Sequence, residues 1–316
     1  MKNSTIKSQL QPGVHKLIHH LDHLKLMIEG GVVAPIHVSV WPTLRCQFKC
    51  SYCCCRNTKT TGKTDLDIND FKKAVDVLFK YGNKAIEFSG GGEPLLWEHF
   101  DDAVDYVYKK GIKISLITNG VNISKISKET LSKLSWLRIS FQSLNHAKSI
   151  DYNHLIGTVR YNASFIVTNQ NLNEPELEKL FLFVKEKNIS LRIAIQRPST
   201  IRFENKVNKV VKNFGAPLFF SNKENGTPLG CYMAWIRPAI DWEGNFLPCP
   251  SIQLNSETEG QIPDNFKLCH ISNLEDWLIK NRVKDLQYKC KFCNCGKEHN
   301  DFIYNLIKGV DDVEFV

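Results

Sequence analysis

Five of the eleven cysteines fall within ten residues, between Cys46 and Cys55. Cys46, Cys50 and Cys53 follow the spacing C-x3-C-x2-C. Three thiolates on one short loop can bind three irons of a cubane iron–sulfur cluster and leave the fourth iron open to a small molecule. The alternatives are a zinc knuckle, which needs four ligands, and a C-x-x-C redox pair. The spacing favours the cluster.

Tyr52 stands directly before Cys53, and with it the loop resembles the signature of radical S-adenosylmethionine (SAM) enzymes. The resemblance implies a [4Fe–4S] cluster whose open iron chelates SAM. It also implies reductive cleavage of SAM to a 5′-deoxyadenosyl radical that removes a hydrogen atom from the substrate. The electron would come from an external donor such as flavodoxin or ferredoxin. Cys46, Cys50 and Cys54 form a competing set of ligands, but Tyr52 and the spacing favour Cys53, and Cys54 and Cys55 remain without a role.

Strands and helices are expected to alternate after an N-terminal helix over residues 15–27. The predicted strands cover residues 36–41, 84–89, 112–118, 136–141, 163–168 and 190–196. The predicted helices between them cover residues 67–79, 97–108, 127–134 and 174–186. Most of these strands read as continuously apolar, which is typical of parallel strands covered on both faces. The sequence therefore predicts an α/β fold with right-handed crossovers.

Periodicity does not distinguish a closed barrel from an open sheet, but the family resemblance implies a partial (β/α)6 barrel of the TIM type over residues 36–198. Residues 1–35 would form an N-terminal helical extension. Residues 199–230, which are polar and irregular, are predicted to be a linker with at most one short amphipathic piece. Residues 231–316 would form a small C-terminal domain of a β-hairpin and a helix.

Glycines follow the second predicted strand in the run Ser89-Gly-Gly-Gly-Glu-Pro94. Ligands of α/β folds bind at the carboxyl ends of the strands. Glycines there allow the backbone to approach a ligand closely, and Pro94 stiffens the exit from the turn. The run resembles the family's GGEP element, which implies that Gly91, Gly92, Glu93 and Pro94 bind the amino group of SAM.

Polar residues also follow the later strands. Asn119, in a Thr-Asn-Gly turn, and Ser140 resemble SAM contacts of the family. Gln142 stands where relatives often have Asp, which puts a carboxylate role at this position in doubt. Gln196 and Arg197 follow the sixth strand and are weaker candidates for ribose, carboxylate or substrate. Glu93, Arg192 and Arg197 are candidates for an acid or base by location alone, so no catalytic acid or base is assigned.

A second group of cysteines lies near the C-terminus. A hairpin around Trp242-Glu-Gly244 is predicted to bring Cys231 and Cys249 together, and Cys290 and Cys293 form a C-x2-C pair. Four thiolates suit zinc or an iron–sulfur cluster, and their spacing alone slightly favours zinc. The pattern C-x12-G-x4-C followed by C-x2-C, however, resembles the twitch form of the SPASM extension, which implies one auxiliary [4Fe–4S] cluster. Cys295 is a reserve ligand, and Cys269 is expected to be a buried or loop thiol.

The composition is that of an ordinary globular protein. The 316 residues carry a net charge of +8 and have a mean hydropathy of −0.26. Neither a signal peptide nor an apolar run of membrane-spanning length is present, so a cytoplasmic protein without a membrane partner is expected. Cysteines in such a setting indicate metal binding more than disulfides. The lysines are spread along predicted helices, so charge alone makes nucleic acid a minor alternative.

The favoured function is a radical SAM oxidoreductase or modifying enzyme that acts on a small metabolite or a peptide. The auxiliary cluster would accept an electron from the substrate radical. One alternative is radical modification of a nucleotide or a nucleic-acid base. The other is a zinc-stapled, basic nucleic-acid-binding protein without catalysis, for which a metal count would show zinc in place of iron.

Overall fold

The computed structural model describes residues 13–55, 62–171, 174–196, 199–215, 218–220, 226–252, 262–288, 290, 293 and 296–309. Their strands form one ten-stranded sheet in the order β10-β9-β8-β1-β2-β3-β4-β5-β6-β7. Strands β1 to β7 run parallel to their neighbours, β8 is parallel to β1, and β9 and β10 pair antiparallel. The strands are β1 (His37–Val40), β2 (Ala85–Phe88), β3 (Lys113–Thr118), β4 (Trp136–Phe141), β5 (Tyr161–Val167), β6 (Leu191–Ile195), β7 (Leu218–Phe220), β8 (Ala239–Ile240), β9 (Asn245–Leu247) and β10 (Cys269–His270).

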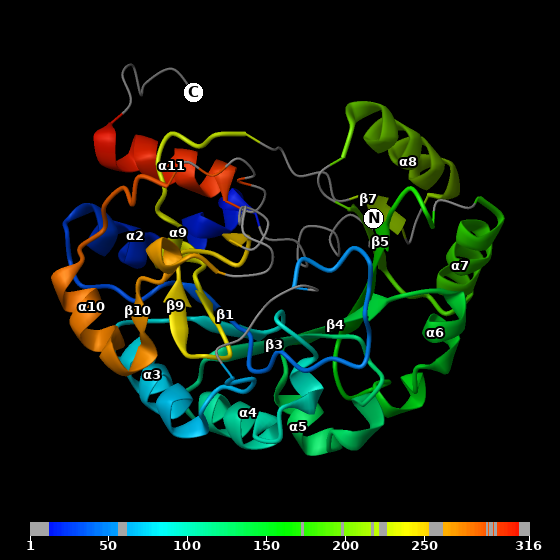
Figure 1. The fold of residues 1–316 in the computed structure, drawn as a ribbon, viewed down its shortest axis with the longest axis horizontal. Helices are drawn as coiled ribbons and strands as arrows, with labels where there is room; N and C mark the ends of the chain where they lie inside the picture. Colours follow the sequence, from blue (N-terminus) through cyan, green and yellow to red (C-terminus); the bar gives the residue numbers. More distant parts are fainter. Residues whose placement is uncertain are drawn as a thin grey trace.

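The sheet curves like part of a barrel wall, and helices cover its convex face (Figure 1). These outer helices are α3 (Ile68–Lys80), α4 (Phe100–Lys109), α5 (Lys128–Lys133), α6 (Leu144–Ser149), α7 (Glu174–Glu186) and α8 (Ile201–Phe214). Short 3-10 helices η2 (Pro94–Leu96), η3 (Ile123–Lys125) and η4 (Tyr152–His154) lie in the connections. The arrangement confirms a mixed α/β fold consistent with a partial TIM-type barrel.

Helix α3 shows how the outer layer forms from the sequence. The Asp67 side chain caps it by accepting hydrogen bonds from the backbone N–H groups of Asn69 and Asp70. Its apolar face is fully buried, and Phe71 packs against Phe88 of β2, with ring centroids 5.8 Å apart. The predicted helix over 67–79 thus agrees with the structure to one residue at each end.

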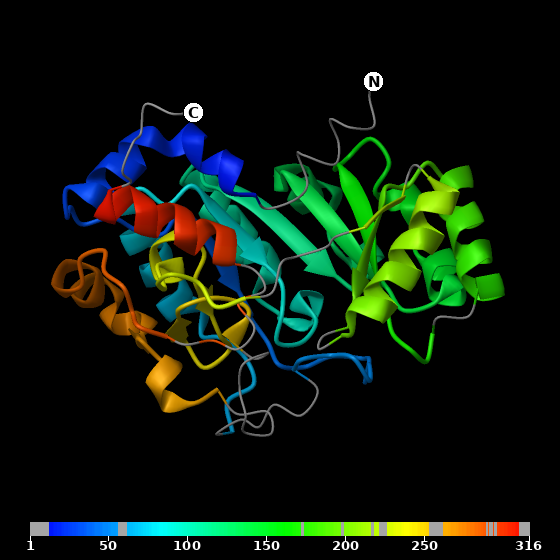
Figure 2. The same cartoon turned by 90° about the horizontal axis from the view of Figure 1, so that it is seen from above.

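The N-terminal helices η1 (Val14–His20) and α2 (Leu21–Ile28) pack against the C-terminal segment. Leu17 and Leu24 share one buried cluster with Trp235 and Ile303. In both views α2 lies beside α11 (Figures 1 and 2). The C-terminal helical elements are α9 (Met233–Ile236), η6 (Asp264–Phe266), η7 (Ile271–Asn273), α10 (Leu274–Lys280) and α11 (Lys297–Lys308). No helix in the described part of the chain is long and apolar enough to cross a bilayer.

Residues 199–230 differ from the irregular linker expected from the sequence. They contain the 14-residue helix α8, and β7 extends the parallel sheet beyond β6. Val207 and Val211, one helical turn apart, are buried in the main core. The helix was missed in the sequence because only a narrow apolar stripe of α8 faces the sheet, and many lysines and asparagines stand between the apolar residues.

Candidate functional site

A cavity of about 810 Å³ lies on the concave side of the sheet. Side chains alternate between the two faces of a strand. On β2, Ile86 and Phe88 face the helices, whereas Glu87 faces the cavity; on β4, Leu137 and Ile139 alternate in the same way with Arg138. The expectation that the strands are apolar on both faces is therefore wrong for the concave face. The wall is only part of a barrel, so polar side chains line a cavity there in place of packed apolar layers.

The cysteine loop follows β1 and lies over one end of this cavity. Cys46, Cys50 and Cys53 line the cavity, and Cys46 and Cys53 are exposed while Cys50 is half-buried. Burial raises the pKa of the Cys46 thiol, and the charges of Cys50 and Cys53 add to this effect, so the three groups are neighbours. Cys54 also lines the cavity, and its Sγ lies 3.8 Å from the Sγ of buried Cys55.

In the described residues no three His, Cys, Asp or Glu side chains converge closely enough to enclose a metal ion. The donor set nevertheless fits an iron–sulfur cluster, because three thiols of one loop border a single cavity and can supply three thiolate ligands. Metal binding would require the loss of their protons.

The glycine-rich loop after β2 supports the cysteine loop. The Gly92 N–H donates to the Thr43 carbonyl oxygen at 2.6 Å, and the Glu93 N–H donates to that of Arg45 at 2.8 Å. A Cβ at Gly92 would overlap the Arg45 carbonyl, and Gly91 has a φ of +76°. These glycines therefore have a structural function besides the expected approach to a ligand: they allow two backbone segments to touch directly ahead of Cys46.

Glu93 connects this loop to the Thr-Asn-Gly turn after β3. Its carboxylate accepts hydrogen bonds from Thr118 Oγ1 at 2.5 Å, from the Asn119 N–H at 2.6 Å and from the Leu95 N–H at 3.2 Å. Burial raises the pKa of Glu93 to about 7, although these hydrogen bonds act in the opposite direction. Asn119 lines the cavity, and its Nδ2 donates to Gln47 Oε1 at 2.9 Å.

Gln142, directly after β4, contacts the cysteine loop. Its Oε1 accepts a hydrogen bond from Cys50 Sγ at 2.8 Å and another from the Tyr52 hydroxyl. Ser140 lines the cavity, with its Oγ 3.5 Å from Ser164 Oγ. The neutral Gln142 amide thus accepts hydrogen bonds from both Cys50 and Tyr52, which precede it by about ninety residues in the chain.

Three other candidates lie away from this cavity or outside the described residues. Pro94 is buried in η2, where it starts the turn after Glu93. Gln196 is half-buried after β6, its N–H donates to the Val167 carbonyl, and it does not line the cavity that the described residues form. Arg197 lies outside the described residues.

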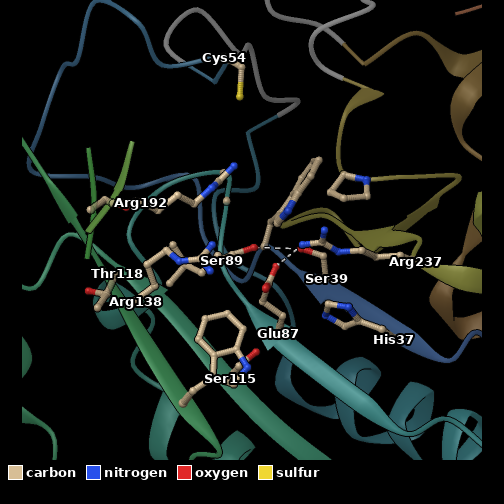
Figure 3. A pocket seen from close by; sticks show the side chains of 18 of the residues that line it. His37, Ser39, Cys54, Glu87, Ser89, Ser115, Thr118, Arg138, Arg192 and Arg237 are labelled. Atoms are coloured by element: carbon tan, nitrogen blue, oxygen red, sulfur yellow. Dashed lines mark hydrogen bonds and ion pairs between the residues drawn. The ribbon is translucent and has the colours of Figure 1, made fainter. Parts of the chain in front are cut away.

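Of the charged residues around Glu87 in the interior of the cavity, only Arg192 was a candidate from the sequence. Glu87 and Arg237 form an ion pair of 2.8 Å, and Arg138 and Arg192 lie on the other side of Glu87 (Figure 3). Burial alone would raise the pKa of Glu87, but Arg237, His37 and Arg138 lower it to about 2. The available signal was the period-two alternation of polar and apolar residues in β2, β4 and β6.

Three of the C-terminal cysteines, Cys231, Cys249 and Cys290, lie near Tyr288. Burial raises the pKa of Cys231 to about 12, and the charges of Cys290 and Cys293 add to it. The pKa of Tyr288 is raised to about 12 by burial, with contributions from Cys231, Cys290 and Cys249. Thiols from the hairpin and from the C-x2-C pair are therefore neighbours. The reserve ligand Cys295 lies outside the described residues.

Cys269, on β10, packs against the main core, where burial raises its pKa to about 12.

Cys293, in the C-x2-C pair, has Asn300 beside it: Asn300 Nδ2 lies 3.6 Å from Cys293 Sγ. The described C-terminal thiols do not converge closely enough to enclose a metal ion, although four thiols as a donor set suit an auxiliary cluster or a zinc ion equally well.

Residues 41–193 match the family model of the radical SAM superfamily. The chain is 30% identical over 163 residues to an S-adenosylmethionine-dependent nucleotide dehydratase of Selenomonas ruminantium, covering 43% of this chain and 58% of that protein. It is 35% identical over 97 residues to the subtilosin biosynthesis protein AlbA of Bacillus subtilis, covering 31% of this chain and 21% of that protein. The chain thus spans less than two thirds of the length of either relative.

Streptococcus suis SuiB bound to its precursor peptide SuiA has a similar fold. The TM-score is 0.56 at 14% identity, with 91% of this chain and 82% of that chain covered. Residues 41–193 of this chain are thus similar in sequence to the radical SAM superfamily, and the described residues share the fold of SuiB.

Proposed function

We propose that this chain is a radical SAM enzyme that removes a hydrogen atom from its substrate. When bound at Cys46, Cys50 and Cys53, a [4Fe–4S] cluster would supply the electron that cleaves SAM to the 5′-deoxyadenosyl radical. The proposal depends on one observation above all: the three-cysteine loop, the glycine-rich loop and the polar residues after β3 and β4 border one end of a single cavity.

The side chains around this end would bind and orient SAM. Gly91, Gly92 and Glu93 hold the chain ahead of Cys46 and border the same space. Asn119, Ser140 and Gln142 line the cavity with amide and hydroxyl groups that can hydrogen-bond to an amino acid or a ribose. Tyr52 and Gln142 hold the Cys50 side of the loop against the end of β4.

Cys231, Cys249, Cys290 and Cys293 would hold an auxiliary [4Fe–4S] cluster. Four protein ligands would close the cluster, which suits the transfer of an electron more than the binding of substrate. A two-electron oxidation of the substrate, with the second electron passing to this cluster, would then be the outcome. The proximity of Cys231 to Cys290 and Cys293 supports this ligand set.

The substrate would be a small molecule or a peptide. SuiB is bound to a precursor peptide, and AlbA is a biosynthesis protein of a bacteriocin, which supports a peptide. The nucleotide dehydratase supports the alternative of a nucleotide substrate. An external reductant such as flavodoxin or ferredoxin would supply the first electron.

Anaerobic reconstitution tests the proposal. The protein should then contain about eight irons and eight sulfides, and with SAM and dithionite it should release 5′-deoxyadenosine. Cys46→Ala should abolish 5′-deoxyadenosine and lower the iron content by about half, and Cys231→Ala should lower the iron content by about half. Cys269→Ala, a buried cysteine outside both ligand sets, should keep all the iron. Zinc in place of iron, or no 5′-deoxyadenosine from fully loaded protein, would contradict the proposal.

A further inference from the structure

One segment of the C-terminal thiol site is held by side chains from much later in the sequence. Residues 229–232 include Cys231, and three of their backbone N–H groups donate to side-chain oxygens. The acceptors are Asp301 for Leu229 at 2.8 Å, Asp285 for Cys231 at 2.8 Å and Asn300 for Tyr232 at 2.7 Å. The backbone on both sides of Cys231 is therefore fixed by groups that lie 54 to 72 positions away.

Asn300, in the first turn of α11, contacts two parts of this site. Its Oδ1 accepts the N–H of Tyr232, one residue after Cys231, and its Nδ2 donates to Cys293 Sγ at 3.6 Å. A single amide therefore connects the chain at Cys231 with the C-x2-C pair. Asn300 is 1% exposed, and its own N–H donates to the Gly296 carbonyl oxygen at 2.7 Å, so its backbone is also held.

The start of α11 packs closely on the segment that follows Cys231. A Cβ at Gly296 would lie 2.7 Å from both Cγ and Sδ of Met233, and 3.4 Å from Asn300 Nδ2. Ile303, about one turn after Asn300, belongs to the same buried cluster as Met233. This packing leaves the Asn300 amide little freedom to turn away from Cys293.

The carboxamide group suits both contacts. Its oxygen accepts a hydrogen bond and its nitrogen donates one, whereas an ionised Asp offers only acceptors. Hydrogen bonds to the sulfurs are among the features that set the reduction potential of an iron–sulfur cluster. Because an N–H donor draws electron density from the sulfur, the Asn300 amide would make a cluster bound at Cys293 easier to reduce.

We propose that Asn300 is a positioning residue of the auxiliary cluster, which fixes Cys293 relative to Cys231 and raises the reduction potential of the cluster through its N–H···S hydrogen bond. The raised potential would favour the passage of an electron from the substrate radical to the C-terminal site. This inference rests on the auxiliary cluster of the proposed function, but it does not depend on which substrate is oxidised.

The Cys46→Ala chain is the background for the test, because it should keep the auxiliary cluster alone. After anaerobic reconstitution, a dithionite titration followed by electron paramagnetic resonance gives the reduction potential, and a chelator assay gives the rate of iron release. Asn300→Ala removes both groups of the amide. Asn300→Asp removes the donor and keeps an oxygen for the Tyr232 N–H, so it tests the donor even where the Ala variant does not fold. Asn305→Asp is the matched control, because Asn305 is exposed on the same helix.

Both Asn300 variants should be reduced at a lower potential than the background, because the N–H···S hydrogen bond is lost. They should also release iron about tenfold faster, whereas Asn305→Asp should match the background in both measurements. Faster iron release at an unchanged potential would reveal a structural contact only and would overturn the proposal. A potential that falls in Asn300→Asp but not in a folded Asn300→Ala would identify the added charge as the cause and would overturn it as well.

The iron content separates this inference from the proposed function. A Cys46→Ala chain without iron would contradict the auxiliary cluster, and the role of Asn300 would fall with it. Iron bound at the same potential in the background and in all three Asn variants would contradict the role of Asn300 alone. Release of 5′-deoxyadenosine by the unmodified chain tests the first cluster and is independent of both results.

Discussion

Replacing Glu87 by Gln removes the charge of the buried carboxylate and keeps its size. Glu87 is 3% exposed, and its Oε1 lies 2.8 Å from Nη2 of Arg237. The neutral amide would leave Arg237 and Arg138 without their common counter-charge. We expect Glu87→Gln to be among the more destabilising single changes at neutral pH, since breaking a buried ion pair from one side leaves the other charge uncompensated.

The size of this effect follows from the pKa of Glu87. Burial acts to raise this pKa, but the attraction of Arg237, His37 and Arg138 lowers it from 4.5 to about 2. A pKa lowered from 4.5 to about 2 corresponds to about 3 kcal/mol of stability for the ionised form. This contribution is complete above about pH 4.5, where the carboxyl of the unfolded chain is also ionised, and it is lost as the pH falls toward 2.

Urea unfolding of the metal-free, reduced chain, followed by tryptophan fluorescence, measures the loss. Glu275→Gln is the matched control, because Glu275 forms an ion pair of 2.6 Å with Lys80 on the exposed surface. Solvent screens this surface pair, so its loss should be much smaller. The difference between unmodified protein and Glu87→Gln should shrink once the pH is lowered below about 4.5.

Equal stability of Glu87→Gln and the unmodified chain at pH 7 would refute the reasoning. So would a loss that does not change on acidification, because a packing defect has no such pH dependence. Either result would mean that Arg138 and Arg237 do not depend on Glu87 for neutralisation.

Three further changes test the frame of the site. Gly92→Ala should lower the iron content of the first cluster, because the new Cβ would push the glycine-rich loop away from the Arg45 carbonyl that precedes Cys46. Gly157→Ala, where a Cβ has no neighbour within 4 Å, should keep the iron. Equal iron contents of the two variants would contradict the proposed role of Gly92 in supporting the cysteine loop. Burial raises the pKa of Glu93 to about 7, so the stability contributed by its protonated form is present below about pH 4.5 and is lost as the pH rises toward 7. In Glu93→Gln the urea concentration at the unfolding midpoint should therefore depend less on pH over this range. A pH dependence equal to that of the unmodified protein would argue against the raised pKa. Gln142→Leu removes the acceptor of the Tyr52 hydroxyl, the contact that can persist once Cys50 has lost its proton to bind iron. Reconstituted iron should therefore be released to a chelator several-fold faster, and an unchanged rate would show that this contact does not hold the loop.

The polar concave face explains why the expectation of strands that are apolar on both faces was wrong. In β4, Trp136–Phe141, hydrophobic residues alternate with Arg138 and Ser140. Taken alone, such a strand could border solvent, a packed core or a cavity, because alternation separates two faces without saying what covers each of them. The helices on one face and the cavity on the other become evident only when the strands are placed side by side.

Several features were determined by local sequence. The spacing of Cys46, Cys50 and Cys53 predicted a three-thiolate loop, and the bounds of β4 and α7 agree with the predicted ranges. Capping residues and apolar spacing act over a few positions, so the sequence contains this information directly.

Tertiary structure alone decided which distant groups meet. Arg237 reaches Glu87 across 150 positions, and Gln142 reaches Cys50 across 92. Periodicity assigns a side chain to a face, but its partner depends on the order and curvature of the strands. The short-range pattern thus determined the chemistry available at the cysteine loop, whereas the folding of the sheet decided that an arginine-rich interior lies beneath it.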